Sequence, residues 1–206
     1  MGEGPANLRG LKISNEIIST FGNLSSLVLN SYGNVETFGS LNLGAENLNL
    51  TINAAGIVGN VAVGGSDGTV AITANQLVLK NTQLAAITNS ASPANALNLN
   101  ANTVILEGNN TNLLAGNAQF NIQGYGQLNI NANDVRVKHT GSTHFDVDQI
   151  NMRVGRIAAE SGAVYTINGT GLMQTEQISP SSVLANDVFA GILTLQANDL
   201  VVGTRV

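Results

Sequence analysis

One pattern of hydrophobic and polar residues recurs along the chain. Its form is apolar-x-apolar-x-Ala-x-x-apolar-x-apolar, in which x is mostly polar. Five full copies begin at Leu41, Val70, Leu97, Leu128 and Leu193. The first four starts recur at intervals of roughly 30 residues, a period that indicates a repeat architecture. The interval between the last two starts is much longer, and Phe145–Met152 is a shortened copy within it.

The pattern describes two short strands joined by a corner. Apolar-x-apolar has the period of a β-strand, in which alternate side chains face one side. The Ala-x-x segment interrupts that period, and we expect the small alanine to fit inside the bend. A third strand is needed to close each coil, and the candidates are Val61–Val63, Phe120–Ile122 and Tyr165–Ile167.

The repeat therefore predicts an all-β fold, a right-handed parallel β-helix (β-solenoid) with loop excursions. The alternative is a β-sandwich, which we disfavour because sandwiches seldom carry so exact a repeat. We expect one β-helical domain over residues 25–206, with excursions near 81–96 and 172–192. Residues 1–24 form a lead-in or cap, in which Ser14–Ile18 predicts one helical turn capped by Ser14.

Composition narrows the class of protein. Apolar residues make up 43% of the 206 residues, so the chain is not an intrinsically disordered protein expanded by charge repulsion. Charged residues are only 10% and the net charge is −5, which disfavours nucleic-acid binding. No apolar run is long enough for a transmembrane helix. The first five residues do not form a signal peptide and are more typical of an artificial junction.

Asparagine is frequent and falls at repeated positions. In four copies of the pattern it directly follows the corner alanine. Stacked strands allow such side chains to exchange amide hydrogen bonds from coil to coil. We therefore expect a structural ladder formed by Asn75, Asn102, Asn133 and Asn198.

The search for reactive groups predicts no catalytic, cofactor-binding or metal-binding residues. The chain has no cysteine, and its two histidines are His139 and His144. Asp146 and Asp148 follow His144 at strand spacing, but a metal site needs more ligands, and we expect a solvated outer face instead. There is no Gly-x-Ser-x-Gly nucleophile motif.

Positive charge is concentrated in one region. Half of the eight basic residues lie close together in the sequence: Arg136, Lys138, Arg153 and Arg156. Because neighbouring coils of a solenoid stack about 4.8 Å apart, these residues are candidates for a stripe that binds an anionic glycan. Ordinary solvation, tempered by nearby aspartates, is the alternative.

The segment from Asn30-Ser31-Tyr32-Gly33-Asn34-Val35 through Leu41-Asn42-Leu43 to Ile52-Asn53-Ala54-Ala55-Gly56-Ile57 resembles filamentous haemagglutinin-like exoproteins of bacterial two-partner secretion. The later Leu-x-Ile-x-Ala-Asn repeats resemble their β-helical shafts, and the resemblance covers roughly residues 25–200. The secretion domain of that family carries Asn-Pro-Asn motifs, which this chain lacks. The resemblance thus implies an interior or C-terminal shaft segment.

Three functions follow as hypotheses. The first is a structural segment of a secreted or surface-exposed exoprotein, monomeric and without cofactors, that serves adhesion or display of a distal domain. Its implied partners are a host or bacterial cell surface and, for the full-length protein, an outer-membrane transporter of the two-partner type. The second is a glycan- or receptor-binding module. The third is a polysaccharide lyase or hydrolase, for which the scattered acids offer little support. Fold alone does not choose between them.

Overall fold

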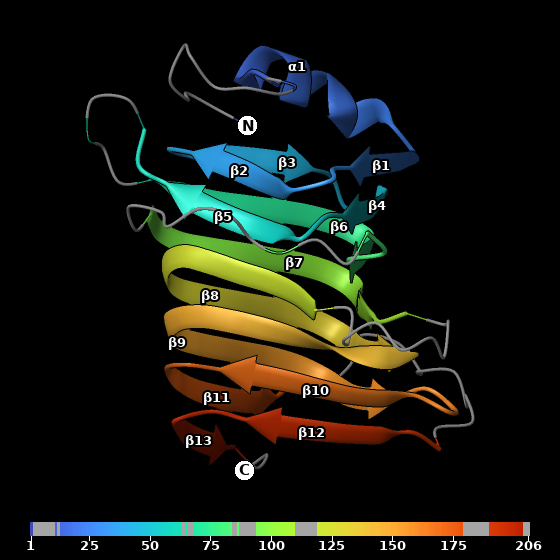
Figure 1. The fold of residues 1–206 in the computed structure, drawn as a ribbon. Coiled ribbons are helices and arrows are strands. Elements are labelled where there is room, and N and C mark those ends of the chain that lie inside the picture. The colour runs from blue at the N-terminus through green and yellow to red at the C-terminus, as the bar shows by residue number, and fades with distance from the viewer. Residues whose placement is uncertain are drawn as a thin grey trace.

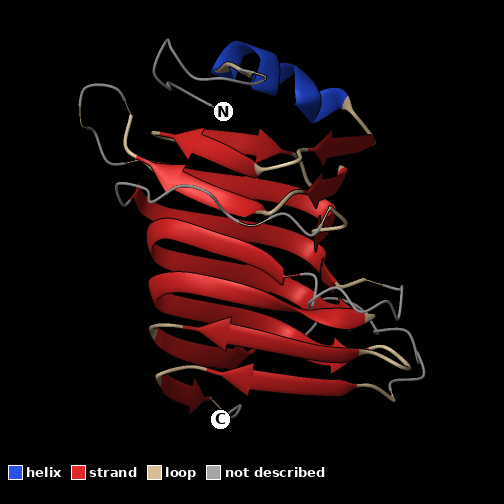
Figure 2. Cartoon of the chain, in the orientation of Figure 1, coloured by secondary structure: helices blue, strands red, loops and turns tan. Residues whose placement is uncertain are grey.

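The computed structural model describes residues 1, 11, 13–62, 65, 68–83, 86, 94–109, 119–178 and 190–203. Within them the chain forms thirteen β-strands and one short α-helix (Figure 2). The strands belong to one continuous sheet, and every pair of neighbouring strands in it is parallel. Parallel pairing throughout is what successive coils of a β-helix produce, and it excludes the β-sandwich.

Each coil consists of up to three straight arms, which we name A, B and C. Four long strands run through more than one arm: β6 (Thr69–Lys80), β7 (Ala94–Glu107), β8 (Gln119–Lys138) and β9 (Thr140–Ala159). Arm A also contains β3 (Leu41–Gly44), β11 (Leu172–Gln177) and β13 (Asp199–Val202). Arm B also contains β1 (Ser26–Asn30) and β4 (Asn49–Asn53). Arm C contains the first residues of β8 and β9 together with β2 (Asn34–Phe38), β5 (Gly56–Asn60), β10 (Val164–Gly169) and β12 (Ile192–Gln196).

The stack runs from the N-terminus at the top of Figure 1 to the C-terminus at the bottom. The nearer strands β10 and β12 run to the left, and the more distant strands β11 and β13 return to the right, while the chain descends (Figure 1). This sense of rotation makes the coil right-handed. The predicted right-handed parallel β-helix is confirmed.

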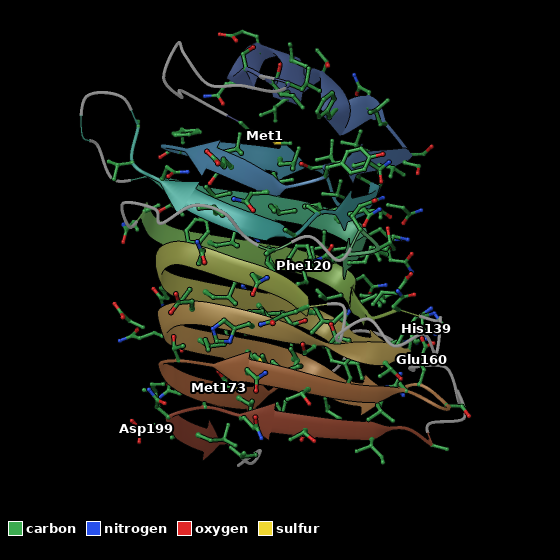
Figure 3. The ribbon with its side chains drawn as sticks, in the orientation of Figure 1. Met1, Phe120, His139, Glu160, Met173 and Asp199 are labelled. Carbon is green, nitrogen blue, oxygen red and sulfur yellow. The ribbon has the colours of Figure 1, made fainter. Side chains whose placement is uncertain are left out.

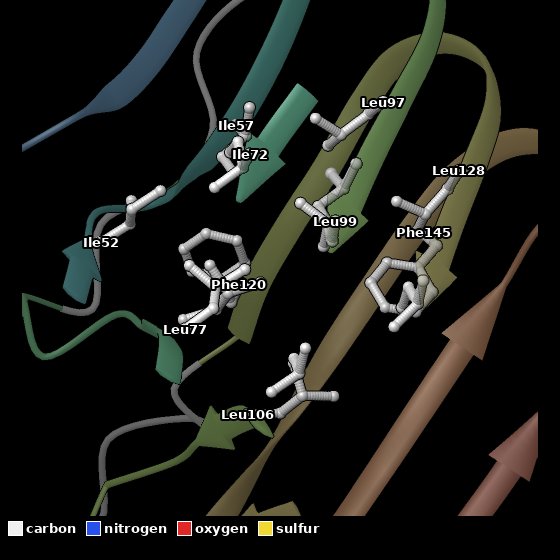
Figure 4. Packing of buried hydrophobic residues seen from close by; sticks show 14 of the residues in the cluster. Ile52, Ile57, Ile72, Leu77, Leu97, Leu99, Leu106, Phe120, Leu128 and Phe145 are labelled. Carbon is white, nitrogen blue, oxygen red and sulfur yellow. The ribbon is translucent and has the colours of Figure 1, made fainter. Parts of the chain in front are cut away.

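The strand register places the motif's apolar positions directly over one another. On arm A, Leu43 lies opposite Ile72, Ile72 opposite Leu99, and Leu99 opposite Ile130. All four side chains are at most 2% exposed and belong to one hydrophobic core. Figure 4 shows Ile72 and Leu99 beside Leu97, Leu128 and Phe145 in this interior. Aliphatic rows of this kind fill a narrow interior without large gaps.

The corner alanines also stack as predicted. Ala74 lies opposite Ala101, and Ala101 opposite Ala132, at the bend between arms A and B. Ala74 and Ala132 are buried. The chain stays in strand conformation through this bend in β6, β7 and β8, so that arms A and B form one bent strand.

The fifth copy of the motif occupies a different corner from the first four. Its first strand, β12, pairs with β10 on arm C, and its second, β13, pairs with β11 on arm A. Leu195 therefore lies opposite Ile167 rather than above Ile130, and it is only partly buried. The shortened copy Phe145–Met152 makes the same passage from arm C to arm A. The motif thus encodes a corner without specifying which one.

The long interval between the fourth and fifth copies contains two further coils. From Leu128 the arm A register continues through Ile150 and Met173 to Leu200, one residue in each successive coil. Ordered strand also reaches into both expected excursions, because 94–96 belong to β7 and 172–177 form β11. Most of the remaining excursion residues lie outside the described part of the chain.

Two of the three predicted closing strands are confirmed. Phe120–Ile122 lies in β8 and Tyr165–Ile167 in β10. The third was misplaced, since β5 ends at Asn60 and the arm C strand of that coil is Gly56–Asn60 itself. Val63 lies outside the described residues.

Arm C omits one level of the stack. On arm C, β5 pairs directly with β8, and Ile57 lies opposite Ile122. On arm A the same distance along the stack contains one more strand, because β6 pairs with β7 and β7 pairs with β8. The close approach requires glycine, because a Cβ on Gly56 would lie 2.2 Å from the Asn121 carbonyl oxygen. A Cβ on Gly59 would lie 2.6 Å from the Tyr125 ring.

Tyr125 brings a hydroxyl into the core beside this omitted level. Its hydroxyl is 2.7 Å from that of Thr37, which forms one buried hydrogen bond. A second pair of the same kind joins Tyr165 and Thr143 at 2.8 Å. Burial raises the pKa of Tyr165 to about 12 and raises that of Tyr125 further. Pairing the hydroxyls avoids the cost of leaving a buried polar group unsatisfied.

A helix covers the N-terminal end of the stack. The predicted turn is confirmed as α1 (Asn15–Thr20), which lies over the first coil in Figure 1 and buries Ile18 in the core. A short 3-10 helix, η1 (Phe21–Asn23), follows it directly. Ser14 occupies the N-cap position, but its side chain makes no capping hydrogen bond. The predicted role of Ser14 as a side-chain cap is therefore wrong.

Leu99→Asp will lower the free energy of unfolding by at least about 3 kcal/mol, because it places a carboxylate without a partner in a dry interior. Asn129→Asp, on the outer side of the next coil, will cost at most about 1 kcal/mol, since the facing amide is able to turn and donate to the new oxygen. Urea denaturation of both variants measures the difference. Equal losses would contradict the assignment of inner and outer faces.

Candidate functional site

The strongest electrostatic feature lies at the outer side of arm B. Asp134 begins this arm on β8, and its side chain is only 1% exposed. Arg156 of the next coil donates to it from Nε at 3.1 Å and from Nη2 at 2.8 Å. Arg136 donates from Nε at 2.5 Å. One buried carboxylate thus holds two guanidinium groups from adjacent coils.

Two opposing effects set the charge state of Asp134. Burial by itself raises the pKa of this carboxyl, because it penalises the ionised form. The hydrogen bonds from Arg156 and Arg136 outweigh burial and leave the pKa below its ordinary value. Asp134 is therefore ionised at neutral pH, and the cluster acts as a clamp between coils.

The other two predicted basic residues are paired as well. Lys138 lies 3.3 Å from Glu160, with both side chains about one-third exposed. Arg153 lies 3.0 Å from Glu176, and this pair is mostly exposed. Arg136, Lys138 and Arg156 belong to arm B, whereas Arg153 belongs to arm A. The four cations do not form one free positive stripe, and an anionic polymer would compete with their carboxylate partners.

The two histidines lie on different parts of the coil. His139 adopts a left-handed conformation, with φ of 61°, at the corner between arms B and C. Figure 3 shows it with Glu160 at one edge of the stack. His144 and Asp146 lie on the outer side of arm C. Among the described residues, no group of three or more His, Asp or Glu side chains is placed to hold a metal ion.

The predicted asparagine ladder forms only in part. Asn133 donates to Asn102 at 2.7 Å across the corner between arms A and B. Asn75 stands at the same corner but donates to Asn49 at 3.2 Å. Asn198 lies at the corner between arms C and A and donates to the Thr170 carbonyl oxygen, so it cannot join this ladder.

A longer ladder, which the sequence analysis missed, runs along the outer side of arm A. Asn129 donates to Asn98 at 2.7 Å and accepts from Asn151 at 2.9 Å, which joins three coils. A parallel rung links Asn131 to Asn100 at 2.9 Å. The signal was present in the polar positions of the apolar-x-apolar strands, where asparagine recurs.

No protein-family model, curated protein or solved structure matches the chain.

The described residues include no helix that is long and apolar enough to cross a membrane.

Asp134→Asn will lower the free energy of unfolding at pH 7 by about 2 kcal/mol, because two guanidinium groups lose a buried anion. A folded-state pKa below the unfolded value of about 3.9 makes this contribution complete above about pH 4. The contribution disappears as the pH falls through the folded-state value. Denaturation curves at pH 7 and pH 3 measure both effects.

The control is Glu176→Gln, which removes an exposed pair and will change stability by less than about 0.5 kcal/mol. A difference between Asp134→Asn and the wild type that persists undiminished at pH 3 would contradict the ionised clamp.

Proposed function

We propose that the chain is a structural β-helical segment of a large secreted or surface-exposed bacterial exoprotein, serving adhesion or display of a distal functional domain. The observation that carries this proposal is the continuous interior, in which inward side chains of successive coils pack row on row without a convergent reactive cluster in the described residues. A rod of stacked coils holds its two ends at a fixed separation, as a shaft must.

The interactions between coils support a mechanical role. Backbone ladders join the described coils, and the Asp134 clamp, the asparagine ladders and the Lys80–Glu107 pair tie neighbouring coils together from outside. Parallel strands in register resist sliding, because a slip would break many such bonds at once. These features favour a stable spacer over a mobile catalytic scaffold.

The last described coil has the geometry of an edge that accepts another coil. Leu200 and Val202 lie in the inward row of arm A, yet Leu200 is 43% exposed and Val202 is 64% exposed. A further coil of the same kind would cover the inward row. At the other end, α1 covers the first coil.

The resemblance to filamentous haemagglutinin-like exoproteins supplies the cellular setting of the proposal. In that setting the parent protein leaves the cell through an outer-membrane transporter of the two-partner type, and this segment stands at the surface as a monomer. The alternative is a glycan- or receptor-binding module, which the paired cations of arm B favour only weakly.

Antibodies raised against the purified chain will label intact cells of the bacterium that encodes it, or its culture supernatant, in immunogold electron microscopy. Antibodies against a cytoplasmic protein provide the control and label only lysed cells. Labelling confined to the cytoplasm would overturn the proposed location and with it the shaft role.

The purified chain will release no reducing ends from pectin, alginate or glycosaminoglycans, with or without calcium. Glycoside hydrolysis requires two carboxyl groups that flank the scissile bond, and the described residues include no cluster of three or more His, Asp or Glu side chains. Reducing-end release that disappears in Asp146→Asn or Asp148→Asn would favour the enzyme instead.

A further inference from the structure

The outer side of arm A is a surface of amides and hydroxyls on β3, β6, β7 and β8, whereas β9, β11 and β13 add the charged residues Arg153, Glu176 and Asp199. On β3, β6, β7 and β8, none of the outward positions of this arm carries a charged residue. The outward polar side chains there are Asn42, Thr69, Thr73, Asn98, Asn100, Gln127, Asn129 and Asn131. Arm B differs sharply, since its outer side carries the Asp134 clamp and two Lys–Glu pairs.

The amide ladder leaves hydrogen-bonding capacity facing outward. An asparagine side chain has two N–H donors and an oxygen with two lone pairs. Asn129 uses one N–H to donate to Asn98 and one lone pair of its oxygen to accept from Asn151. One donor and one acceptor of this amide thus stay available to a ligand, and Asn98 and Asn151 keep at least as much. All three side chains are partly exposed.

The ladder also fixes these groups before any ligand arrives. Each amide is held by the coil above or below, on strands that are bonded along their length. Binding therefore costs little side-chain entropy, which is the main benefit of preorganisation. The rungs repeat at the spacing of adjacent strands, about 4.8 Å. An extended β-linked sugar chain advances by a similar distance per residue.

We propose that the outer side of arm A binds a neutral polysaccharide, which lies across β7, β8 and β9 and forms hydrogen bonds with Asn98, Asn129 and Asn151. Hydroxyl groups donate and accept as amides do, so each sugar pairs with one rung. The lack of charge on β3, β6, β7 and β8 suits an uncharged polymer. On β9 the outward cation Arg153 lies 3.0 Å from Glu176, so a uronic or sulfated chain would have to displace that carboxylate.

The side chains of this surface also determine how binding depends on the length of the sugar chain. None of its outward positions on β3, β6, β7 and β8 is aromatic, so it lacks a stacking platform for a single sugar. Each rung contributes weakly, and the affinity grows with the number of rungs that one chain engages at once. Long polymers will therefore bind and monosaccharides will not.

This inference extends the proposed function, and it rests on that function only for the place where the protein meets the polymer. Its test uses the purified chain, so failure of glycan binding leaves the surface location intact. Conversely, failure of immunogold labelling leaves the binding result intact.

Affinity gel electrophoresis with hydroxyethyl cellulose, galactomannan and heparin tests the proposal. The wild-type chain will be retarded by at least one of the two neutral polymers, equally in low and in high salt, because hydrogen bonds between neutral groups are not screened. Free glucose and mannose will not compete. Retardation by heparin alone, lost at high salt, would assign binding to the cations and overturn the proposal.

Two variants locate the surface. Asn129→Ala removes both ladder bonds at the central rung and will weaken retardation at least tenfold. Asn151→Asp keeps an oxygen at its position but brings a charge onto the surface, and it will weaken retardation similarly. The matched control is Asn75→Ala, which removes an amide-to-amide bond at the corner between arms A and B and will bind as the wild type does.

Thermal melting shows that each variant is folded before its binding is compared. Absence of retardation by either neutral polymer would overturn the proposal. So would wild-type binding in both Asn129→Ala and Asn151→Asp, or an equal loss of binding in folded Asn75→Ala.

Discussion

Parallel backbone hydrogen bonding between successive coils is the constraint on which the whole molecule depends. β8 is joined to β7 on one side and to β9 on the other along most of its length. Because the side-chain period of a strand is two, this register copies each residue's inward or outward direction into the next coil. A Leu thus lies over an Ile inside, and an Asn over an Asn outside. The core, the corner alanines and the amide ladders are all consequences of that one alignment.

The repeat was sufficient to predict the fold class and two of the three arms. Its apolar positions lead directly to the buried row of Leu43, Ile72, Leu99 and Ile130, since a dry interior tolerates little else. Which corner of the coil the fifth copy forms could not be predicted in the same way. A corner between arms A and B and one between arms C and A demand the same local pattern, and only pairing with distant strands distinguishes them. In the coil of β10 and β11, which lacks the motif, the sequence indicated the closing strand Tyr165–Ile167 but not β11.

Features that depend on two coils at once were the hardest to infer. Arg153 and Glu176 are far apart in the sequence, and nothing local indicates that they meet. The clamp at Asp134 similarly needs Arg156 from the following coil. The asparagine ladder was placed at the alanine corner because that position is easiest to align. The longer ladder runs where flat strands hold neighbouring amides in the same orientation.

The omitted level on arm C has a consequence for the shape of any longer assembly. Between β5 and β8 that side of the stack is shorter by one strand spacing, about 4.8 Å, than the side that carries β6, β7 and β8. Because one side of the stack is shorter than the other, the coils beyond the omission tilt toward the shorter side. In a shaft built of many coils, each such omission sets a fixed change of direction. Its position along the sequence, here marked by the two glycines of β5, then determines where a distal part points.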